Sequence, residues 1–342
     1  LNNMNNYIEE VRKRSQNLLI VEGKHEKDEL FKLLFRCFPE MKISMHDIWI
    51  YGTNIYMLYE DIVKEYGEQW EKDDIDLPFV ISKKQGRVPL RYKEDFTNII
   101  LVFDYERQDT NFSEDKIICM QNYFMDATNT GKLYINYPMI ESYQHLCSLP
   151  DRDYFDRKIP VSLRPGRKYK SLVREESVIE KFIEFPKRID ELLKEHFKIA
   201  DDEKRRECCE KIFALKSEEN LHEQIHTILS GIIKAEYADT AKYQLAYMIK
   251  RVKYAKSGQT YWRCMRNIFK QIILHNVFKA VKLQYNIEIT DKEKYRDNFE
   301  RIDPNIILNI QNTVSKNNES GFIWILCTCV FLVPEYNRAL VA

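Results

Sequence analysis

The sequence predicts an α/β fold in the N-terminal part of the chain, with a parallel sheet flanked by helices, followed by an all-helical part. Short apolar runs typical of buried strands alternate with helical patterns over residues 1–150. From about Glu175 onward the apolar spacing is almost entirely helical. We therefore expect an α/β domain over 1–150, a basic connector over 151–170 and a helical domain over 171–342.

The elements of the first domain follow from apolar spacing. A polar leader over 1–16, helical or frayed, precedes a strand over 17–22. Leu30, Leu33 and Leu34 mark a helix over 26–37. The further expected elements are strands at 47–51, 79–81, 99–104 and 132–137, and helices at 54–66 and from about Glu114.

In the second domain the same spacing predicts helices at 178–185, 189–197, 221–233, 243–252, 268–281 and 306–314. The apolar run from Phe322 to Val333 is too short to span a bilayer, and we expect a buried helix there.

The composition limits the classes of partner. Lys plus Arg and Asp plus Glu each number 53, so the formal net charge is +0. Binding to nucleic acid or acidic membranes must then come from local patches. The eight cysteines form no C-x-x-C pair and the start of the chain is polar. We expect reduced thiols in a cytoplasmic protein that does not enter a membrane.

Acidic residues follow two of the predicted strands. Glu22 ends the first strand, and Asp104 and Glu106 end the strand at 99–104. If these strands are neighbours in a parallel sheet, the carboxylates converge at one edge and raise one another's pKa unless a cation neutralises them. Oxygen ligands of this kind suit Mg²⁺ or Mn²⁺.

The segment Val21-Glu22-Gly23 followed by a helix, with a later apolar strand ending in Asp104-x-Glu106, resembles the TOPRIM domain. That domain occurs in topoisomerases, bacterial primases, small-RNA maturation nucleases and overcoming-lysogenisation-defect (OLD) nucleases. The resemblance covers about residues 15–150. The chain departs from the usual pattern because Glu106 stands where a second aspartate is common, which changes the reach of this ligand.

The resemblance implies a set of site residues. Glu22 would act as metal ligand or general acid/base, Asp104 and Glu106 as metal ligands, and Glu26 as the extra acid of OLD nucleases. Asp109 and Glu141 are candidate ligands of a second ion. One or two Mg²⁺ or Mn²⁺ ions would activate water against a phosphodiester.

Basic residues near this site are candidates for nucleic-acid contact. Lys24 lies beside Glu22, where His25 is a candidate proton shuttle. Further contacts are expected from Lys83, Lys84, Arg87, Arg91, Lys253, Lys256 and Arg263, with aromatic neighbours that could stack bases. The alternative for each is an ordinary solvated charge.

The resemblance implies a metal-dependent nuclease that acts as an effector of bacterial antiphage defence, similar to OLD nucleases or to the TOPRIM partner of the PARIS system. The chain has no G-x-x-x-x-G-K-S/T phosphate loop, so a separate ATPase partner is expected. The substrate would be DNA or RNA, including tRNA. The helical domain would contact the partner or form a homodimer.

Two other classes of function compete. His222-Glu223-x-x-His226 is an H-E-x-x-H motif, which on a helix could hold Zn²⁺ as in a metalloprotease, with Glu236 as third ligand. Its polar flanks and the lack of a predicted strand upstream speak against it. The third possibility is a TOPRIM-like fold that binds without catalysis.

Overall fold

The structure is a computed structural model that describes residues 16–288 and 294–341. These residues form two compact units. The sheet unit contains the chain up to Glu176 and again from Ile272, and the helical unit contains Ser177–Gln271. The expected leader lies almost wholly outside the described residues. Within the described ranges, no helix combines the length and apolar character needed to span a bilayer.

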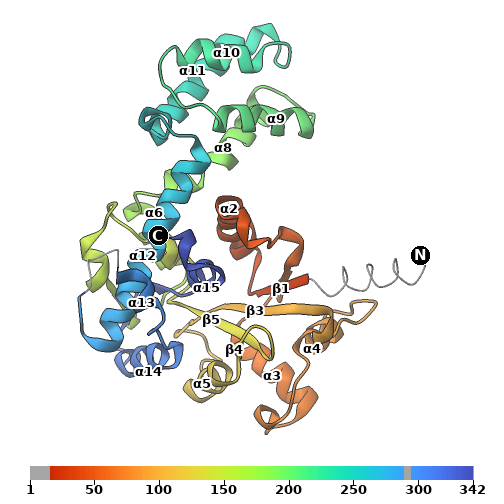
Figure 1. Cartoon of the computed structure of the whole chain (residues 1–342), viewed down its shortest axis with the longest axis vertical. Helices are drawn as coiled ribbons and strands as arrows, with labels where there is room; N and C mark the ends of the chain where they lie inside the picture. Colours follow the sequence, from red (N-terminus) through yellow and green to blue (C-terminus); the bar gives the residue numbers. More distant parts are fainter. Residues whose placement is uncertain (1–15, 289–293, 342) are drawn as a thin grey trace. The chain divides into compact units, whose positions relative to one another are not determined.

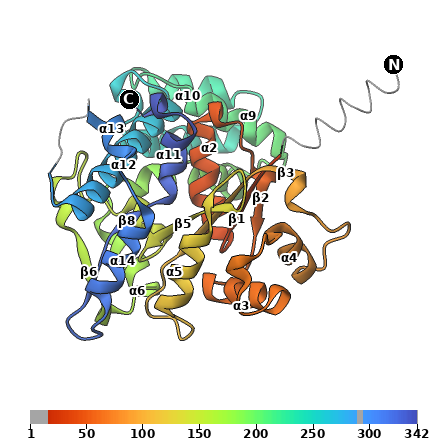
Figure 2. The same ribbon diagram turned by 60° about the horizontal axis from the view of Figure 1, so that its bottom comes forward.

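The centre of the sheet unit is a sheet with four parallel strands in the order β2 (Ile48–Ile50), β1 (Gln16–Val21), β3 (Phe96–Asp104) and β5 (Gly131–Tyr137). Figure 2 shows these strands side by side. Two short strands, β4 (Met125–Asp126) and β8 (Leu326–Cys327), pair antiparallel with β5. In the middle strands β1 and β3, residues 18–21 and 99–103 are all apolar and buried, as expected for a parallel sheet covered on both faces.

Helices cover both faces of this sheet (Figure 1). The π-helical turn η1 (Glu26–Phe31), α2 (Lys32–Cys37) and α15 (Leu332–Tyr336) lie on one face. On the other face lie α3 (Ile55–Tyr66), α4 (Leu77–Lys84), α5 (Glu114–Tyr123) and α14 (Pro304–Ser315). The unit also contains α6 (Arg167–Glu176), α13 (Tyr295–Phe299) and a two-stranded sheet of β6 (Lys158–Pro160) and β7 (Phe322–Trp324).

The helical unit consists of α7 (Glu180–Ile183), α8 (Phe185–Glu191), η9 (Leu192–His196), α9 (Asp202–Phe213), α10 (Leu221–Leu229) and α11 (Ala235–Val252). The long helix α12 (Tyr261–Tyr285) begins in this unit and ends in the sheet unit. An aromatic cluster forms part of the core of the helical unit, where the ring of Phe185 contacts Phe213, Tyr254 and Tyr261.

The predicted α/β class is confirmed at the level of a mostly parallel sheet flanked by helices. The expected strand at 79–81 is wrong because these residues belong to α4. The Asp76 side chain accepts the backbone N–H of Phe79, and Pro78 stands in the first turn. An N-cap followed by proline in the first turn is a helix-start signal that outweighs the three apolar residues.

The expected helix over 322–333 is also wrong. This run is divided into β7, β8, the 3₁₀ turn η12 (Cys329–Phe331) and the start of α15. Because β8 pairs with β5, residues after 272 return to the sheet unit. The structural division therefore differs from the predicted boundaries at 150 and 170.

Candidate functional site

The carboxyl end of the sheet contains a topological switch point between β1 and β3. The chain leaves β1 toward β2 on one side, and it leaves β3 toward β5 on the other. Helices that follow strands in opposite directions leave a crevice at this point, which is where ligands bind in open parallel sheets. Glu22 follows β1, and Asp104 ends β3, so both acids lie at the switch point.

Glu22 and Asp104 are in direct contact. The Asp104 backbone N–H donates to Glu22 Oε2 over 3.3 Å. Glu26 bends back to the same turn, where its Oε2 accepts the Gly23 N–H over 2.9 Å. The strand pairing and the tight turn at Gly23 thus bring the three predicted acids together.

The pKa values of these carboxyl groups reflect how close together they lie. Burial, followed by the charges of Glu106 and Glu26, raises the pKa of Glu22 to about 8. Burial raises the pKa of Asp104 well above its usual value, with Glu22 and Glu26 as the next causes. For Glu26 the pKa is also raised, first by burial. These acids therefore disfavour one another's ionised forms, as expected where no cation balances them.

Asp104 also carries an unsatisfied atom. Its side chain is buried, with 4% of the residue exposed, and Oδ1 has no hydrogen-bond partner among the described residues. Buried polar atoms in native proteins nearly always have a partner, so this oxygen is available to accept an ion or a water.

Glu106 and Asp109 lie in the turn after β3. Glu106 has φ 39°, in the left-handed region that non-glycine residues rarely adopt, and strain of this kind concentrates at functional sites. Its pKa is raised by burial and by Asp109, while a hydrogen bond with the Asn54 side chain opposes the shift. Asp109 Oδ1 accepts the backbone N–H of Asn111 over 2.7 Å, so it stabilises the loop at the border of the site.

Glu141 differs from the other acids because two cations neutralise it. It lies on the 3₁₀ turn η6 (Ile140–Gln144) after β5, and only 2% of it is exposed. His25 Nε2 lies 2.9 Å and Lys170 Nζ 2.8 Å from Glu141 Oε1. Burial alone would raise the pKa of Glu141, but these contacts outweigh it and lower the pKa. The contacts of His25 with Glu141 and Glu29 raise the pKa of His25 to about 9 despite its burial.

Lys170 was not singled out in the sequence as a site residue, because it lies in the basic connector segment without a motif. Its place on α6, opposite Glu141, depends on long-range packing. The charges of Glu141, Asp104 and Glu26 raise its pKa against the effect of burial. It is therefore a cation that faces the acidic cluster.

The acidic set is a loose cluster. Within the part of the chain that the structure describes, the only group of three His, Cys, Asp or Glu side chains with ligand atoms all within 4.8 Å lies elsewhere, at His145, Cys147 and Glu176. The predicted ligands Glu22, Glu26, Asp104 and Glu106 thus share one edge of the sheet without forming a closed ligand cage.

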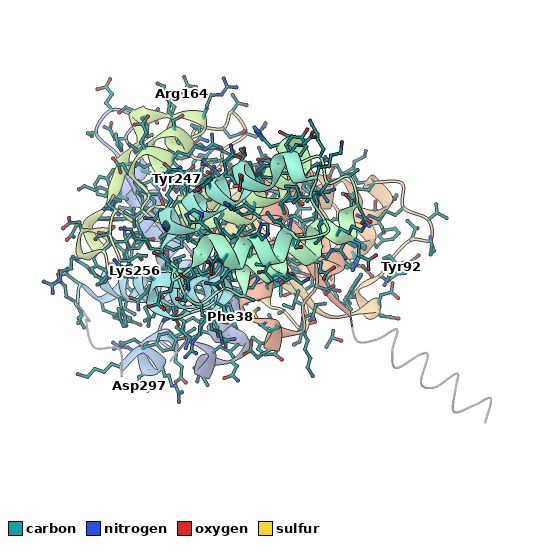
Figure 3. The ribbon with its side chains drawn as sticks, turned by 90° about the horizontal axis from the view of Figure 1, so that it is seen from above. Phe38, Tyr92, Arg164, Tyr247, Lys256 and Asp297 are labelled. Carbon is teal, nitrogen blue, oxygen red and sulfur yellow. The ribbon has the colours of Figure 1, made fainter. Side chains whose placement is uncertain are left out.

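Most of the predicted basic residues before β3 have local acidic partners. Lys83 pairs with Glu65 at 2.7 Å, Lys84 with Asp61 at 2.5 Å and Arg91 with Asp95 at 2.9 Å. The Arg87 guanidinium lies 3.9 Å from the centre of the Trp49 ring. Figure 3 labels Tyr92 in the loop between α4 and β3. The charges of Lys83, Lys84 and Arg91 are therefore partly neutralised. Lys24, two residues after Glu22, is exposed.

The remaining predicted contacts, Lys253, Lys256 and Arg263, lie in the helical unit, and all three are exposed. Lys256 is labelled in Figure 3. The structure places them in a different unit from the acidic cluster.

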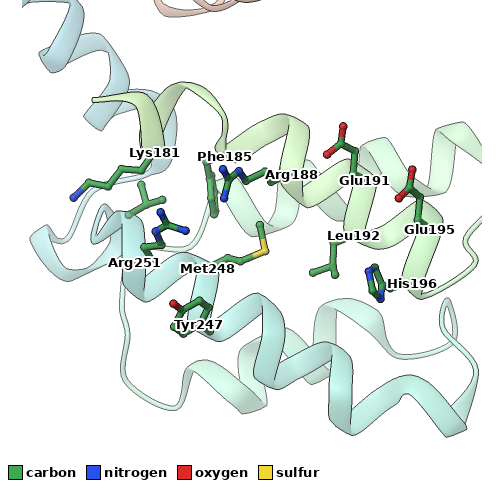
Figure 4. Close-up of a pocket in the computed structure, with 11 residues that line it drawn as sticks. Lys181, Phe185, Arg188, Glu191, Leu192, Glu195, His196, Tyr247, Met248 and Arg251 are labelled. Atoms are coloured by element: carbon green, nitrogen blue, oxygen red, sulfur yellow. The ribbon is translucent and has the colours of Figure 1, made fainter. Parts of the chain in front are cut away.

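The helical unit has a pocket of its own, with a volume of about 310 Å³, between α8 with η9 and α11. Its charges are separated (Figure 4). Lys181, Arg188 and Arg251 line one end, and Glu191 and Glu195 line the other. None of the residues predicted from the sequence lines this pocket.

A wider cavity of about 780 Å³ lies at the opposite, amino end of the sheet, lined by Asn17, Asn98 and Lys132 among others. It contains none of the buried acids. The acidic residues lie instead at the switch point on the carboxyl edge, which is where parallel sheets bind ligands.

The H-E-x-x-H motif lies on α10, with His222 and His226 one turn apart. The His222 ring packs against Tyr243, with centroids 4.7 Å apart. Within residues 16–288 and 294–341, no third ligand joins the two histidines in a compact group. The expected third ligand, Glu236, is exposed and lies 4.0 Å from Lys234.

Comparisons with protein-family models, with curated proteins and with solved structures find no match for this chain.

Proposed function

We propose that this chain is a metal-dependent nuclease whose metal centre is formed by Glu22, Asp104 and Glu106, with Glu26 beside them. The observation that carries the proposal is the contact between Glu22 and the Asp104 amide at the switch point, next to a buried Asp104 oxygen without a partner. Carboxylates gathered in this way are stable as anions only with a cation among them.

The residues fit a hard divalent cation. All of them supply carboxylate oxygens, which Mg²⁺ and Mn²⁺ prefer over softer ligands such as thiolates. Such an ion, when bound, would polarise a phosphoryl oxygen and lower the pKa of a coordinated water. The loose arrangement of the acids would accommodate one ion or two, with Asp109 at the border.

The other residues of the site would orient the substrate. Glu141 holds His25 and Lys170 in place, and these two cations face the acidic cluster. We propose that Lys170 and the exposed Lys24 bind phosphate oxygens of a nucleic acid as point charges. Glu141 itself would act as an anchor for these cations rather than as a free ligand.

The resemblance to TOPRIM domains supports the same reaction. The acids of the Val21-Glu22-Gly23 segment and of Asp104-x-Glu106 end neighbouring parallel strands. By that resemblance we propose a cytoplasmic effector of antiphage defence, acting on DNA or RNA such as tRNA and controlled by a separate ATPase. The exposed cations of the helical unit, Lys253, Lys256 and Arg263, would contribute to nucleic-acid or partner contact.

The decisive experiment is cleavage of DNA, RNA and tRNA by purified protein with Mg²⁺ or Mn²⁺. Glu22→Gln and Asp104→Asn should abolish cleavage while circular dichroism shows an unchanged fold. Asp28→Asn, which changes an exposed acid on the same segment, is the matched control and should cleave normally. Cleavage that survives in both site variants would refute the proposal.

Binding and peptidase assays on the same purified protein test the two competing functions. A non-catalytic module would bind nucleic acid or metal without cleaving any substrate. A zinc metalloprotease would hydrolyse peptides and lose that activity in His222→Ala. The lack of a third ligand near His222 and His226 among the described residues favours the nuclease.

A further inference from the structure

The loop after η6 and the end of α6 bring three metal-ligating side chains together in the sheet unit. His145 Nε2 lies 2.8 Å from Glu176 Oε2, and Cys147 Sγ lies 3.9 Å from the same oxygen. All the ligand atoms of this group lie within 4.8 Å of one another. These residues are separate from the acidic cluster, and no sequence motif singled them out.

The His145 side chain is held in a fixed orientation by its surroundings. The His145 ring is buried, with 1% of the residue exposed, and its Nδ1 lies 3.1 Å from the Tyr169 hydroxyl. This hydrogen bond fixes the ring orientation and leaves Nε2 directed at Glu176. In metal sites, the ring nitrogen that does not bind the ion usually has such a partner.

The loop that carries Cys147 is also fixed. The Cys147 backbone N–H donates to Asp151 Oδ2 over 2.7 Å. Arg157 donates both to Asp151 Oδ2, over 2.7 Å, and to the His145 carbonyl, over 2.9 Å. The two ligands of the loop are thus placed by contacts that do not involve an ion, which reduces the cost of ordering on binding.

We propose that His145, Cys147 and Glu176 bind one Zn²⁺ ion. The donors are an imidazole nitrogen, a thiolate sulfur and a carboxylate oxygen, a mixed set that suits Zn²⁺ and not Mg²⁺. The thiolate and the carboxylate together balance the charge of the ion. Cys147 is half-buried and Glu176 is exposed, so water can fill the fourth position of a tetrahedral site.

Binding would proceed with release of protons. The Cys147 thiol loses its proton to solvent, and in the tautomer in which His145 Nε2 donates to Glu176, the ion displaces that proton to solvent as well. No oxidation or reduction is involved. The ion would link the loop after η6 to α6, and η6 and α6 themselves carry Glu141 and Lys170. The inference does not depend on the nuclease proposal.

The test is a zinc titration of the full-length protein, stripped of metal and kept reduced, against a chromophoric chelator. Wild type should bind one Zn²⁺ tightly. Cys147→Ser and Glu176→Gln should each weaken binding at least tenfold, because each removes a ligand. Both side chains are at least partly exposed, so these variants should fold, as thermal melting in chelator would verify. Cys119→Ser, at a half-buried cysteine elsewhere, is the matched control and should bind as wild type.

Cobalt gives a second readout that is independent of affinity. Co²⁺ bound to a thiolate shows a sulfur-to-metal charge-transfer band, which should appear in wild type and Cys119→Ser and be absent from Cys147→Ser. No tight zinc binding by wild type, or a band that persists in Cys147→Ser, would overturn the proposal. Zinc binding that is lost in His222→Ala but retained in Cys147→Ser would also overturn it, and would assign the ion to the helical unit.

Discussion

The backbone amide of Asp104 donates a hydrogen bond to the side chain of Glu22, although the two residues are 82 positions apart in sequence. The contact exists because β1 and β3 pair in parallel, with Val21 opposite Val102. It places two carboxyl groups, whose ionised forms are disfavoured by burial and by each other's charge, at the carboxyl edge of the sheet. Several measurable properties follow from this arrangement.

Neutralising one of these acids should stabilise the protein when no divalent cation is present. Asp104→Asn removes a buried carboxyl group whose raised pKa costs stability at neutral pH, so we expect the free energy of unfolding to rise by about 1–3 kcal/mol. Urea unfolding in EDTA measures the change. In saturating Mg²⁺ or Mn²⁺ the order should reverse, since only wild type gains binding energy. A variant that is less stable than wild type in EDTA would contradict the prediction.

Stability in EDTA should fall as the pH rises from about 4.5 to about 8. The pKa of Glu22 is raised from 4.5 to about 8 in the folded protein, first by burial and then by Glu106 and Glu26. In this window the folded state holds a proton that the unfolded state has released, so a higher pH favours unfolding. Thermal melting across the window measures the effect. Glu22→Gln should show a flatter profile, and an equally steep one would argue against Glu22 as the source.

Lys170→Met should destabilise the sheet unit by about 1–3 kcal/mol. It leaves Glu141, which is nearly inaccessible, with His25 as its cationic partner among the described residues. The double variant Lys170→Met with Glu141→Gln should recover part of the loss, because the uncompensated charge is then gone. A double-mutant cycle by urea unfolding gives the coupling energy. Lys168→Met, at an exposed position of the same helix, serves as the control.

Asp76→Ala should cost about 1–2 kcal/mol of stability. The Asp76 carboxylate caps α4 through the Phe79 N–H and also accepts the Lys93 N–H over 3.1 Å. Its loss leaves both donors without this acceptor. Chemical unfolding of Asp76→Ala and of Asp76→Asn separates the two contributions, since asparagine retains a capping oxygen. Equal stability of all three proteins would mean that the cap does not hold α4.

The parallel strands could be predicted because each is a continuous apolar run that ends in polar residues. β1, β3 and β5 were expected within a few residues of their observed bounds. The meeting of Glu22 with Asp104 followed from the same pattern, since acids after neighbouring parallel strands share an edge.

Elements without periodicity could not be predicted in this way. The run from Phe322 to Val333 is almost continuously apolar, and most of it is buried, so its apolar residues do not distinguish a helix from a strand. Its true structure depends on the pairing of β8 with β5, which no local signal reveals. The roles of Lys170 and of the group at His145, Cys147 and Glu176 depend on the packing of α6 in the same way.

The return of residues after 272 to the sheet unit makes the helical unit an insertion within a single fold. β8 covers the end of β5, where Asn136 lies opposite both Asp104 and Cys327. A nascent chain therefore exposes that edge of β5 on the ribosome until residue 327 has emerged, a stage at which open strands invite misassembly. Truncation upstream of β8 should thus disturb Asn136, which accepts a hydrogen bond from the Cys327 thiol 191 residues later, and with it the neighbouring Asp104.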